Sequence, residues 1–161
     1  MNKNSSSVRT GKSHLGGALF AAKDIHAGEN ILKMEGPIKT FAEAVISDTA
    51  AGDSYTVQIG QDAFFDPALP GRCLNHSCEP NAALQGIMLS AIRDIAEGEE
   101  ITFDYSTTMD EDGWTLECRC GSPSCRKVIE DFVRLPSDVQ ERYISQGIVQ
   151  PYILTKYFKK I

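Results

Sequence analysis

Residues 75–81 read Asn-His-Ser-Cys-Glu-Pro-Asn, and residues 98–105 read Gly-Glu-Glu-Ile-Thr-Phe-Asp-Tyr. Both stretches are dense in polar side chains, and each adjoins short apolar runs of the length of β-strands. Taken alone, Asn75 and His76 fit an ordinary capped turn, and Tyr105 fits a core tyrosine. The significance of the two stretches therefore depends on the rest of the chain.

On either side of these stretches, the chain contains mostly short apolar runs bounded by turn residues. Such runs predict short strands, and apolar residues three and four apart predict helices. Strands are expected at 18–21, 31–34, 55–59, 63–65, 84–92 and, as the last one, 101–103. A short helix is expected over 41–47, and two more are expected after Pro136 and Pro151. Residues 24–29 and 94–99 share the pattern Asp-Ile-x-x-Gly-Glu, which predicts two turns of similar design.

The composition limits the classes of function. The 161 residues carry 16 basic and 22 acidic side chains, a net charge of −6. Direct nucleic-acid binding is not expected, since it needs clustered Lys and Arg. Residues 90–125 hold 2 basic and 9 acidic side chains, an excess that is either solvated surface or a rim that attracts a cationic substrate. No apolar run predicts a membrane span, and no leader predicts export.

Five cysteines in a chain without export signals indicate metal ligation rather than disulfides. Cys118, Cys120 and Cys125 form a C-x-C-x4-C cluster whose three thiolates can converge on one ion. Zinc prefers four tetrahedral ligands, so a fourth must come from elsewhere. Cys78 and Cys73 are the candidates, and the three histidines are weaker ones.

Together, three segments resemble one protein family. Residues 75–81 resemble the N-H-S-C-x-P-N motif of SET-domain protein lysine methyltransferases, and residues 98–105 resemble the family's G-E-E-[IL]-T-F-D-Y motif. Residues 118–126 resemble its post-SET C-x-C-x4-C-R element, and all three occur in the family's order. With an N-terminal segment like G-x-G-[LV]-F-A, the resemblance covers roughly residues 13–127.

The resemblance implies a mainly β fold of small curved sheets with a pseudoknot-like threading, an exception to the usual unthreaded connections. It implies methyl transfer from S-adenosylmethionine to a lysine amine of a protein. The implied cofactor-binding residues are Gly16, Gly17, Ala18, Leu19, Asn75, His76 and Tyr105. Tyr105 is the implied catalytic residue, and Tyr55 and Phe103 would line the lysine channel. Phe103, at a place where tyrosine restricts the product, predicts di- or trimethylation.

In the family, the cysteine of N-H-S-C joins the three post-SET cysteines on zinc. The resemblance therefore selects Cys78, with Cys118, Cys120 and Cys125, as the Zn²⁺ ligands, and leaves Cys73 as a packed thiol. The implied organisation is a flexible tail (1–12), a SET core (13–106), a post-SET segment (107–127) and a helical C-terminal extension (128–161).

Two departures from the family pattern motivate an alternative. Ala18 stands where a second glycine is usual, and the segment between Met34 and Tyr55, which helps the family grip its substrate, is short. The alternative is a catalytically weak SET-like module that binds a peptide or protein partner. For an enzyme, the expected partner is a lysine-containing protein with a basic tail, such as a histone tail. A homodimer through the C-terminal extension and an intracellular location, nuclear or cytoplasmic, complete the expectations.

Overall fold

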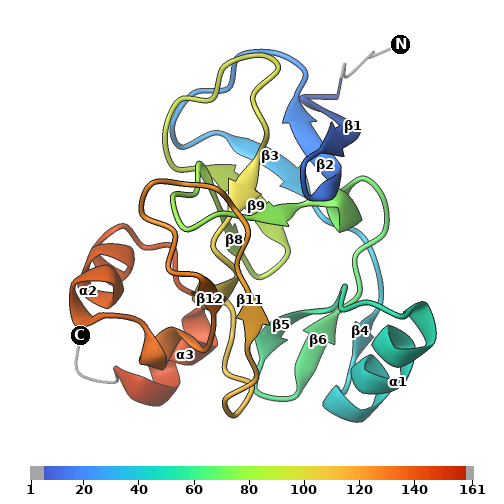
Figure 1. Cartoon of the computed structure of the whole chain (residues 1–161), viewed down its shortest axis with the longest axis vertical. Coiled ribbons are helices and arrows are strands. Elements are labelled where there is room, and N and C mark those ends of the chain that lie inside the picture. The colour runs from blue at the N-terminus through green and yellow to red at the C-terminus, as the bar shows by residue number, and fades with distance from the viewer. Residues whose placement is uncertain (1–5, 159–161) are drawn as a thin grey trace.

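The computed structural model describes residues 6–158 of the chain. Small β-sheets surround the centre of the molecule, and short helices lie at its periphery (Figure 1). The expected mainly β class is therefore confirmed. Within residues 6–158 no helix is both long enough and apolar enough to cross a membrane.

Twelve short strands and three α-helices make up the described fold. The strands are β1 (Val8–Ser13), β2 (Gly16–Ala21), β3 (Asn30–Lys33), β4 (Ile38–Lys39), β5 (Val57–Gly60), β6 (Ala63–Phe65), β7 (Asn75–His76), β8 (Ala82–Gln85), β9 (Met88–Ala91), β10 (Thr102–Phe103), β11 (Leu116–Glu117) and β12 (Val128–Ile129). The α-helices are α1 (Phe41–Ala51), α2 (Ser137–Ser145) and α3 (Pro151–Tyr157). Single turns of 3-10 helix span Gly71–Cys73, Tyr105–Thr107 and Phe132–Arg134.

Five sheets are formed by pairing strands that are mostly near neighbours in sequence. Antiparallel sheets have the orders β3-β9-β8 and β4-β6-β5, and β1-β2 and β11-β12 form two-stranded antiparallel ribbons. The exception is β7 with β10, which pair in parallel. Parallel strands need a crossover connection, and here the connection between β7 and β10 contains the β8–β9 hairpin. This pairing brings the two polar stretches of the sequence side by side.

The N-terminal boundary of the ordered fold is earlier than expected. Residues 8–12 were assigned to a flexible tail on the basis of their polar composition, and this is wrong. They form most of β1, which pairs residue for residue with β2, from Val8 opposite Ala21 to Ser13 opposite Gly16. Two features hold β1 in place: Val8 is buried in the main core cluster, and the backbone of β1 is hydrogen-bonded to β2. Residues 1–5 lie outside the described residues.

Two strand predictions also need correction. The run 84–92, expected as one strand, forms the β8–β9 hairpin, with Leu84 opposite Leu89 and Gln85 opposite Met88. Gly86 makes the turn with φ of 55°, a left-handed conformation that glycine adopts without strain. Residues 101–103 do not end the sheets, because β11 and β12 follow in the cysteine-rich segment.

The repeated Asp-Ile-x-x-Gly-Glu segments pair with each other. Ile25 and Ile95 exchange backbone hydrogen bonds of 2.9 and 2.8 Å. The Asp24 carboxylate accepts from the backbone N–H of Glu97, and the Asp94 carboxylate accepts from that of Ala27. The two turns are thus related by an approximate twofold symmetry that fixes the upper end of the fold (Figure 1).

Helix α1 is longer than the expected 41–47 and begins at a capping box. The Thr40 side chain accepts from the backbone N–H of Glu43, and the Glu43 carboxylate accepts from the backbone N–H of Thr40. The helix ends at Gly52, whose φ is 71°. It lies beside β4 and β6, at the end of the molecule away from β1 and β2 (Figure 1).

The C-terminal extension covers the core. Helices α2 and α3 begin at the expected places after Pro136 and at Pro151. Buried side chains of these helices and of the segments that flank them form a second apolar cluster with Ala83 of β8: Phe132, Leu135, Tyr143, Ile148, Val149 and Ile153. The buried Gln150 amide donates to the carbonyls of Leu84 and Gly86, so the extension is tied to the β8–β9 hairpin.

Candidate functional site

The site is built where β7 and β10 run in parallel. Thr102 lies opposite Asn75 and Phe103 opposite His76, and the backbone N–H of Ser77 donates to the Phe103 carbonyl. The chain then turns, and the backbone N–H of Tyr105 donates to His76 Nδ1 at 3.1 Å. The Tyr105 ring packs between the rings of His76 and Phe103, with centroid distances of 5.3 and 4.9 Å. The two motifs therefore form one structural unit.

On one side of this unit is a hollow of about 450 Å³. Leu15, Gly17, Cys73, Asn75, His76 and Tyr105 are among the residues that line it. The Asn75 amide donates to the Gly17 carbonyl and to the Glu100 carboxylate, each at 2.9 Å. A Cβ on Gly17 would lie 3.6 Å from Cys73 Sγ, an ordinary van der Waals distance, so the Gly17 backbone lies beside this thiol. Of the expected segment 16–19, Gly17 lines the hollow with its backbone, whereas Ala18 and Leu19 are buried.

Ala18 and Leu19 do not present their side chains to this hollow. Both are fully buried, and Leu19 belongs to the main core cluster. The Ala18 methyl group therefore does not crowd the hollow, which removes one of the two motives for the alternative of a catalytically weak module. Cys73 needs the opposite correction: its thiol is half-buried and lines the hollow, so it is not a fully packed residue.

On the other side of Tyr105 lies a narrow channel of about 110 Å³. The structure brings Tyr55, Phe103 and Tyr105 together in its lining, with the apolar side chains of Met34, Val57, Leu74, Met109, Trp114 and Leu116. The Tyr105 hydroxyl donates to the Leu74 carbonyl at 2.9 Å. Burial raises the pKa of Tyr105 above its usual range, with the Asp53 and Glu100 charges adding to this effect, so the hydroxyl stays neutral.

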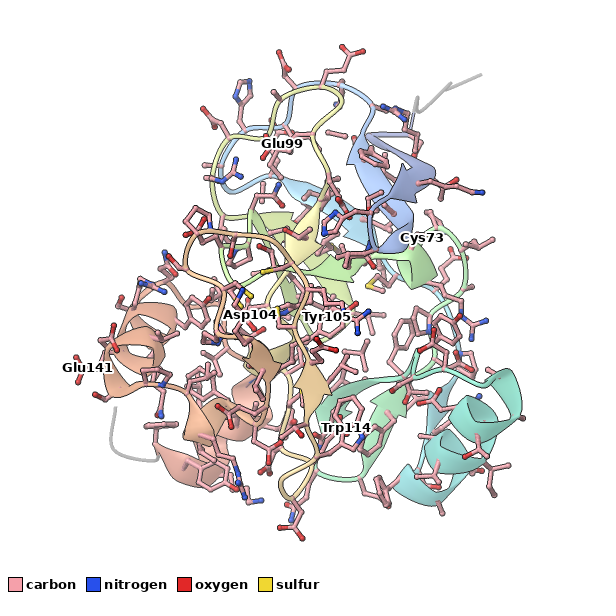
Figure 2. The ribbon with its side chains drawn as sticks, viewed as in Figure 1. Cys73, Glu99, Asp104, Tyr105, Trp114 and Glu141 are labelled. Carbon is pink, nitrogen blue, oxygen red and sulfur yellow. The ribbon has the colours of Figure 1, made fainter. Side chains whose placement is uncertain are left out.

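The hollow and the channel meet at Tyr55 and Tyr105, which line both. Figure 2 shows Tyr105 near the centre of the molecule, with Cys73, which lines the hollow, and Trp114, which lines the channel, in different directions from it. Arg72 also lines both spaces, and its guanidinium lies 4.5 Å from the centroid of the Tyr55 ring. The hollow and the channel are thus adjacent, with Tyr55, Arg72 and Tyr105 in the wall of both.

The comparisons with known proteins agree with this geometry. The SET domain family matches residues 16–106, more than half of the chain. The chain belongs to the SET domain family. Its resemblance to SET-domain methyltransferases, inferred from three motifs, is therefore confirmed.

Curated relatives with this domain are much longer proteins. The chain is 31% identical over 134 residues to histone-lysine N-methyltransferase trithorax of Drosophila virilis, a match of 73% of this chain and 3% of the relative. It is 32% identical over 145 residues to the H3 lysine-4 specific histone-lysine N-methyltransferase of Schizosaccharomyces pombe, covering 76% and 16%. The chain therefore spans only a small part of these relatives.

The fold matches solved SET domain structures as well. The Chaetomium thermophilum complex ctPRC2, in an autoinhibited conformation bound to S-adenosylmethionine, superposes with a TM-score of 0.58 at 28% identity. The superposition covers 66% of this chain and 16% of that one.

Beside the SET motifs, the structure gathers a cluster of metal-ligating side chains. His76 Nε2 and the sulfurs of Cys78, Cys118 and Cys120 all lie within 4.8 Å of one another. Cys125 Sγ lies 3.6 Å from Cys118 Sγ, which is itself 3.7 Å from Cys78 Sγ. Tetrahedral zinc with Zn–S bonds of about 2.3 Å would place its sulfurs about 3.8 Å apart. The donor set and spacing fit a zinc ion.

His76 is the competitor of Cys125 for the fourth ligand position. Its Nδ1 accepts a hydrogen bond from the Tyr105 N–H, so the neutral ring carries its proton on Nε2. Burial lowers the pKa of His76 to about 4, which keeps the ring neutral. Nε2 is then a donor to Cys78 Sγ, 3.3 Å away, and has no lone pair for a metal. The hydrogen-bond pattern therefore favours Cys125 as the ligand.

The SET motif, the cysteine segment and the C-terminal extension are joined at one buried carboxylate. The Asp104 carboxylate accepts from Arg126 Nη2 at 2.9 Å, forms an ion pair with Arg126 Nη1 at 2.8 Å, and accepts from the Tyr143 hydroxyl at 2.9 Å. The backbone N–H of Ser106 also donates to it. A buried carboxylate needs such partners. The residue next to Tyr105 is thus held by three parts of the chain.

Proposed function

We propose that the chain transfers a methyl group from S-adenosylmethionine to the side-chain amine of a lysine in a protein substrate. The observation that carries the proposal is the meeting of the hollow and the channel at Tyr105. The hollow, with Gly17, Asn75 and His76, would hold the cofactor, and the channel would hold the lysine side chain. S-adenosylmethionine supplies a methyl group on a positively charged sulfur.

The reaction needs a neutral amine, whereas free lysine has a pKa of about 10.4. The apolar side chains of the channel disfavour the ammonium form, whereas the Asp53 and Glu111 carboxylates that also line it favour that form. A positive sulfur beside the amine would shift the balance toward the neutral amine. The lysine nitrogen then forms a bond to the methyl carbon while the carbon–sulfur bond breaks and the sulfur keeps the electron pair. The proton leaves to water, so no strong base is required.

Tyr105 would act by alignment rather than by proton transfer. Its neutral hydroxyl is fixed by the bond to the Leu74 carbonyl, and its oxygen keeps lone pairs that can hold the amine and the methyl group in line. The Leu74 carbonyl is a second acceptor at the same point. These groups need only to be correctly positioned and need not transfer a proton, which is consistent with the raised pKa of Tyr105.

The first test is calorimetric binding of S-adenosylmethionine to the zinc-loaded chain, followed by methyl transfer to histones and other basic proteins. The variant Tyr105→Phe should lower kcat by about 100-fold, because the acceptor that aligns the reacting atoms is lost. Tyr157→Phe is the matched control, since the Tyr157 hydroxyl binds Asp110 on the surface. Absence of cofactor binding at millimolar ligand would refute the proposal, whereas full activity in Tyr105→Phe would refute only this role of Tyr105.

The substrate class is proposed at a coarser level from the relatives, whose names describe histone-lysine methyltransferases. A basic tail, such as that of a histone, would complement the acidic excess of residues 90–125. A histone substrate would place the chain with chromatin. Homodimerisation through the C-terminal extension stays a prediction, checked by sedimentation of the purified chain.

A further inference from the structure

Next to the lysine channel lies a second cavity that the proposed reaction does not use. It has a volume of about 520 Å³ and lies between α1, residues 52–56, Phe64 and the loop 111–114. Asp53, Ser54, Thr56, Glu111 and Trp114 line both this cavity and the channel. A peptide whose lysine occupies the channel would therefore pass a neighbouring side chain over the second cavity. We call this cavity the side groove.

The walls of the side groove are apolar and partly exposed. Phe41 and Phe64 pack with ring centroids 5.5 Å apart, and Phe41 is 54% exposed. Val45, on the next turn of α1, is 47% exposed, and Trp114 on the opposite wall is 40% exposed. Large apolar groups that stay exposed around a cavity indicate a surface that packs against another chain.

The charge in the side groove is entirely negative. Its lining includes the carboxylates of Asp48, Asp53 and Glu111 and no lysine or arginine. Asp48 is fixed by donors from residues 54–56, whereas no hydrogen bond or ion pair reaches the Glu111 carboxylate within residues 6–158. The backbone N–H groups of Glu111 and Gly113 both donate to Asp131, so the loop that carries Glu111 is held in place.

Only one kind of side chain matches both features. Arginine has an apolar stem that packs on aromatic walls, and its guanidinium stacks on rings and pairs with carboxylates through several donors. An apolar side chain would leave the Glu111 carboxylate without a cation. Lysine would offer a compact and strongly hydrated charge that stacks poorly.

We propose that the side groove binds an arginine side chain that lies close to the target lysine in the substrate. This proposal rests on the proposed lysine methyl transfer and names its substrate class more narrowly. Phe41, Val45 and Trp114 would pack on the arginine stem and guanidinium face, and Glu111 with Asp48 would balance its charge. The site would therefore select substrates in which an arginine accompanies the lysine.

The test uses synthetic peptides that contain a single lysine among neutral residues. Arginine is placed in turn at each of the two positions before and after the lysine, with citrulline at the same place as the uncharged counterpart. Peptide binding is measured by calorimetry with the zinc-loaded full chain, and kcat/KM is measured separately with S-adenosylmethionine. At one position we expect arginine to bind at least 10-fold more tightly than citrulline and to raise kcat/KM by a similar factor through KM.

Two variants test whether the side groove causes the preference for arginine over citrulline. Glu111→Gln should reduce the arginine-to-citrulline ratio to below 3-fold, whereas Glu141→Gln, an equal loss of charge on the remote helix α2, should leave it unchanged. Val45→Lys places a cation on the exposed wall of the groove and should abolish or reverse the preference without touching the core. A preference that survives both groove variants would overturn the proposal, as would a lysine that replaces the arginine without loss.

The outcomes separate the groove from the reaction. If arginine and citrulline peptides are methylated equally well, the side groove has no such role and methyl transfer stands. If the arginine peptide binds selectively but is never methylated, the groove stands and the proposed reaction fails. If no peptide binds or reacts, both proposals are overturned.

Discussion

Phe103 lines the proposed lysine channel, where its size would set the space beside the reacting amine. Its ring is buried, lines the channel and packs against the Tyr105 ring. The variant Phe103→Tyr would place a hydroxyl in this apolar space and hold a water where a methylated amine must fit. We expect the product to shift from di- or trimethyllysine to monomethyllysine, with the first methyl transfer slowed by less than about 10-fold. Mass spectrometry of a methylated peptide measures this, and an unchanged product distribution would contradict the assignment.

The charged form of the Glu111 side chain is unfavourable in the folded protein. Burial raises the pKa of Glu111 to about 7, and the charges of Asp131 and Asp48 add to this effect. Because the folded-state pKa exceeds the unfolded one, this group stabilises the fold below about pH 4.5 and loses that effect as the pH rises through 7. On going from pH 5.5 to pH 8.5, the wild type should therefore lose about 2 kcal/mol of unfolding free energy through this group. Glu111→Gln lacks the group and should not show this loss.

Urea unfolding at the two pH values measures this change. Glu141→Gln, which removes an exposed carboxyl on α2, is the control and should change the same difference by less than about 0.5 kcal/mol. A Glu111 variant that behaves like the Glu141 variant would show that the wild-type carboxyl is not perturbed.

Residues inside motifs could be predicted from the sequence, and residues outside them could not. Asn75, His76 and Tyr105 stand in patterned stretches, and the structure brings them together as expected. Leu74, Glu111 and Trp114 line the channel without any local pattern. Their positions depend on tertiary contacts, such as the two backbone bonds from the loop 111–113 to Asp131, which no local spacing encodes. Only the single tryptophan of the chain, in an acidic stretch, offered a signal.

Among the helices and strands, the elements whose bounds the sequence predicts wrongly share a physical cause. The strand expected over 84–92 is a hairpin because Gly86 turns the chain and Gln150, 64 residues away, satisfies the turn by accepting from the Gly86 N–H and donating to its carbonyl. The residues of β1 are polar and short of apolar signal, and they become a strand only because β2 pairs with them. The echo of 24–29 in 94–99 predicted two similar turns, but only the structure shows that they pair with each other. Local patterns indicate elements, and pairing between elements decides their bounds.

The ribbon β11–β12 and the cysteines around it form an element that we expect to depend on the metal. Its buried residues are few: Cys118 and Ile129 pack with Cys78 and Met109 in a small cluster of their own. Removal of zinc with a chelator should therefore disorder residues 116–129 and abolish methyl transfer, while β8 and β9 keep their structure. Hydrogen exchange of the two regions, before and after chelation, measures this, and added zinc should restore both order and activity.

The same element distinguishes the metal ligands. Cys125→Ser should lose or greatly weaken the bound zinc, whereas Cys73→Ser, which removes the thiol that lines the hollow, should keep one zinc per chain. Metal content after dialysis is the measurement. Undiminished zinc in Cys125→Ser would assign the fourth position to His76 and refute the hydrogen-bond argument for its tautomer.

At the scale of the whole molecule, the two apolar clusters and the cysteine cluster meet around Asp104. Figure 2 shows Asp104 and Tyr105 together near the centre of the molecule, between the C-terminal helices and the side of the molecule that carries Cys73 and Trp114. The Tyr143 hydroxyl on α2 reaches Asp104 across 39 residues of sequence. The extension is therefore not a passive cover, because one of its buried polar groups contacts the residue beside the proposed catalytic tyrosine.

This coupling predicts a stability effect larger than that of a surface hydrogen bond. Tyr143→Phe keeps the ring that fills the second cluster and removes only the hydroxyl, leaving the Asp104 carboxylate buried with one donor fewer. A hydrogen bond to a buried charge contributes about 1.5–3 kcal/mol, so unfolding free energy should fall by that amount. Tyr157→Phe, which removes an exposed hydroxyl bonded to Asp110, should cost less than about 1 kcal/mol. Because Asp104 precedes Tyr105, Tyr143→Phe should also lower kcat more than it changes cofactor binding, and equal stability losses in the two variants would show that the extension only covers the core.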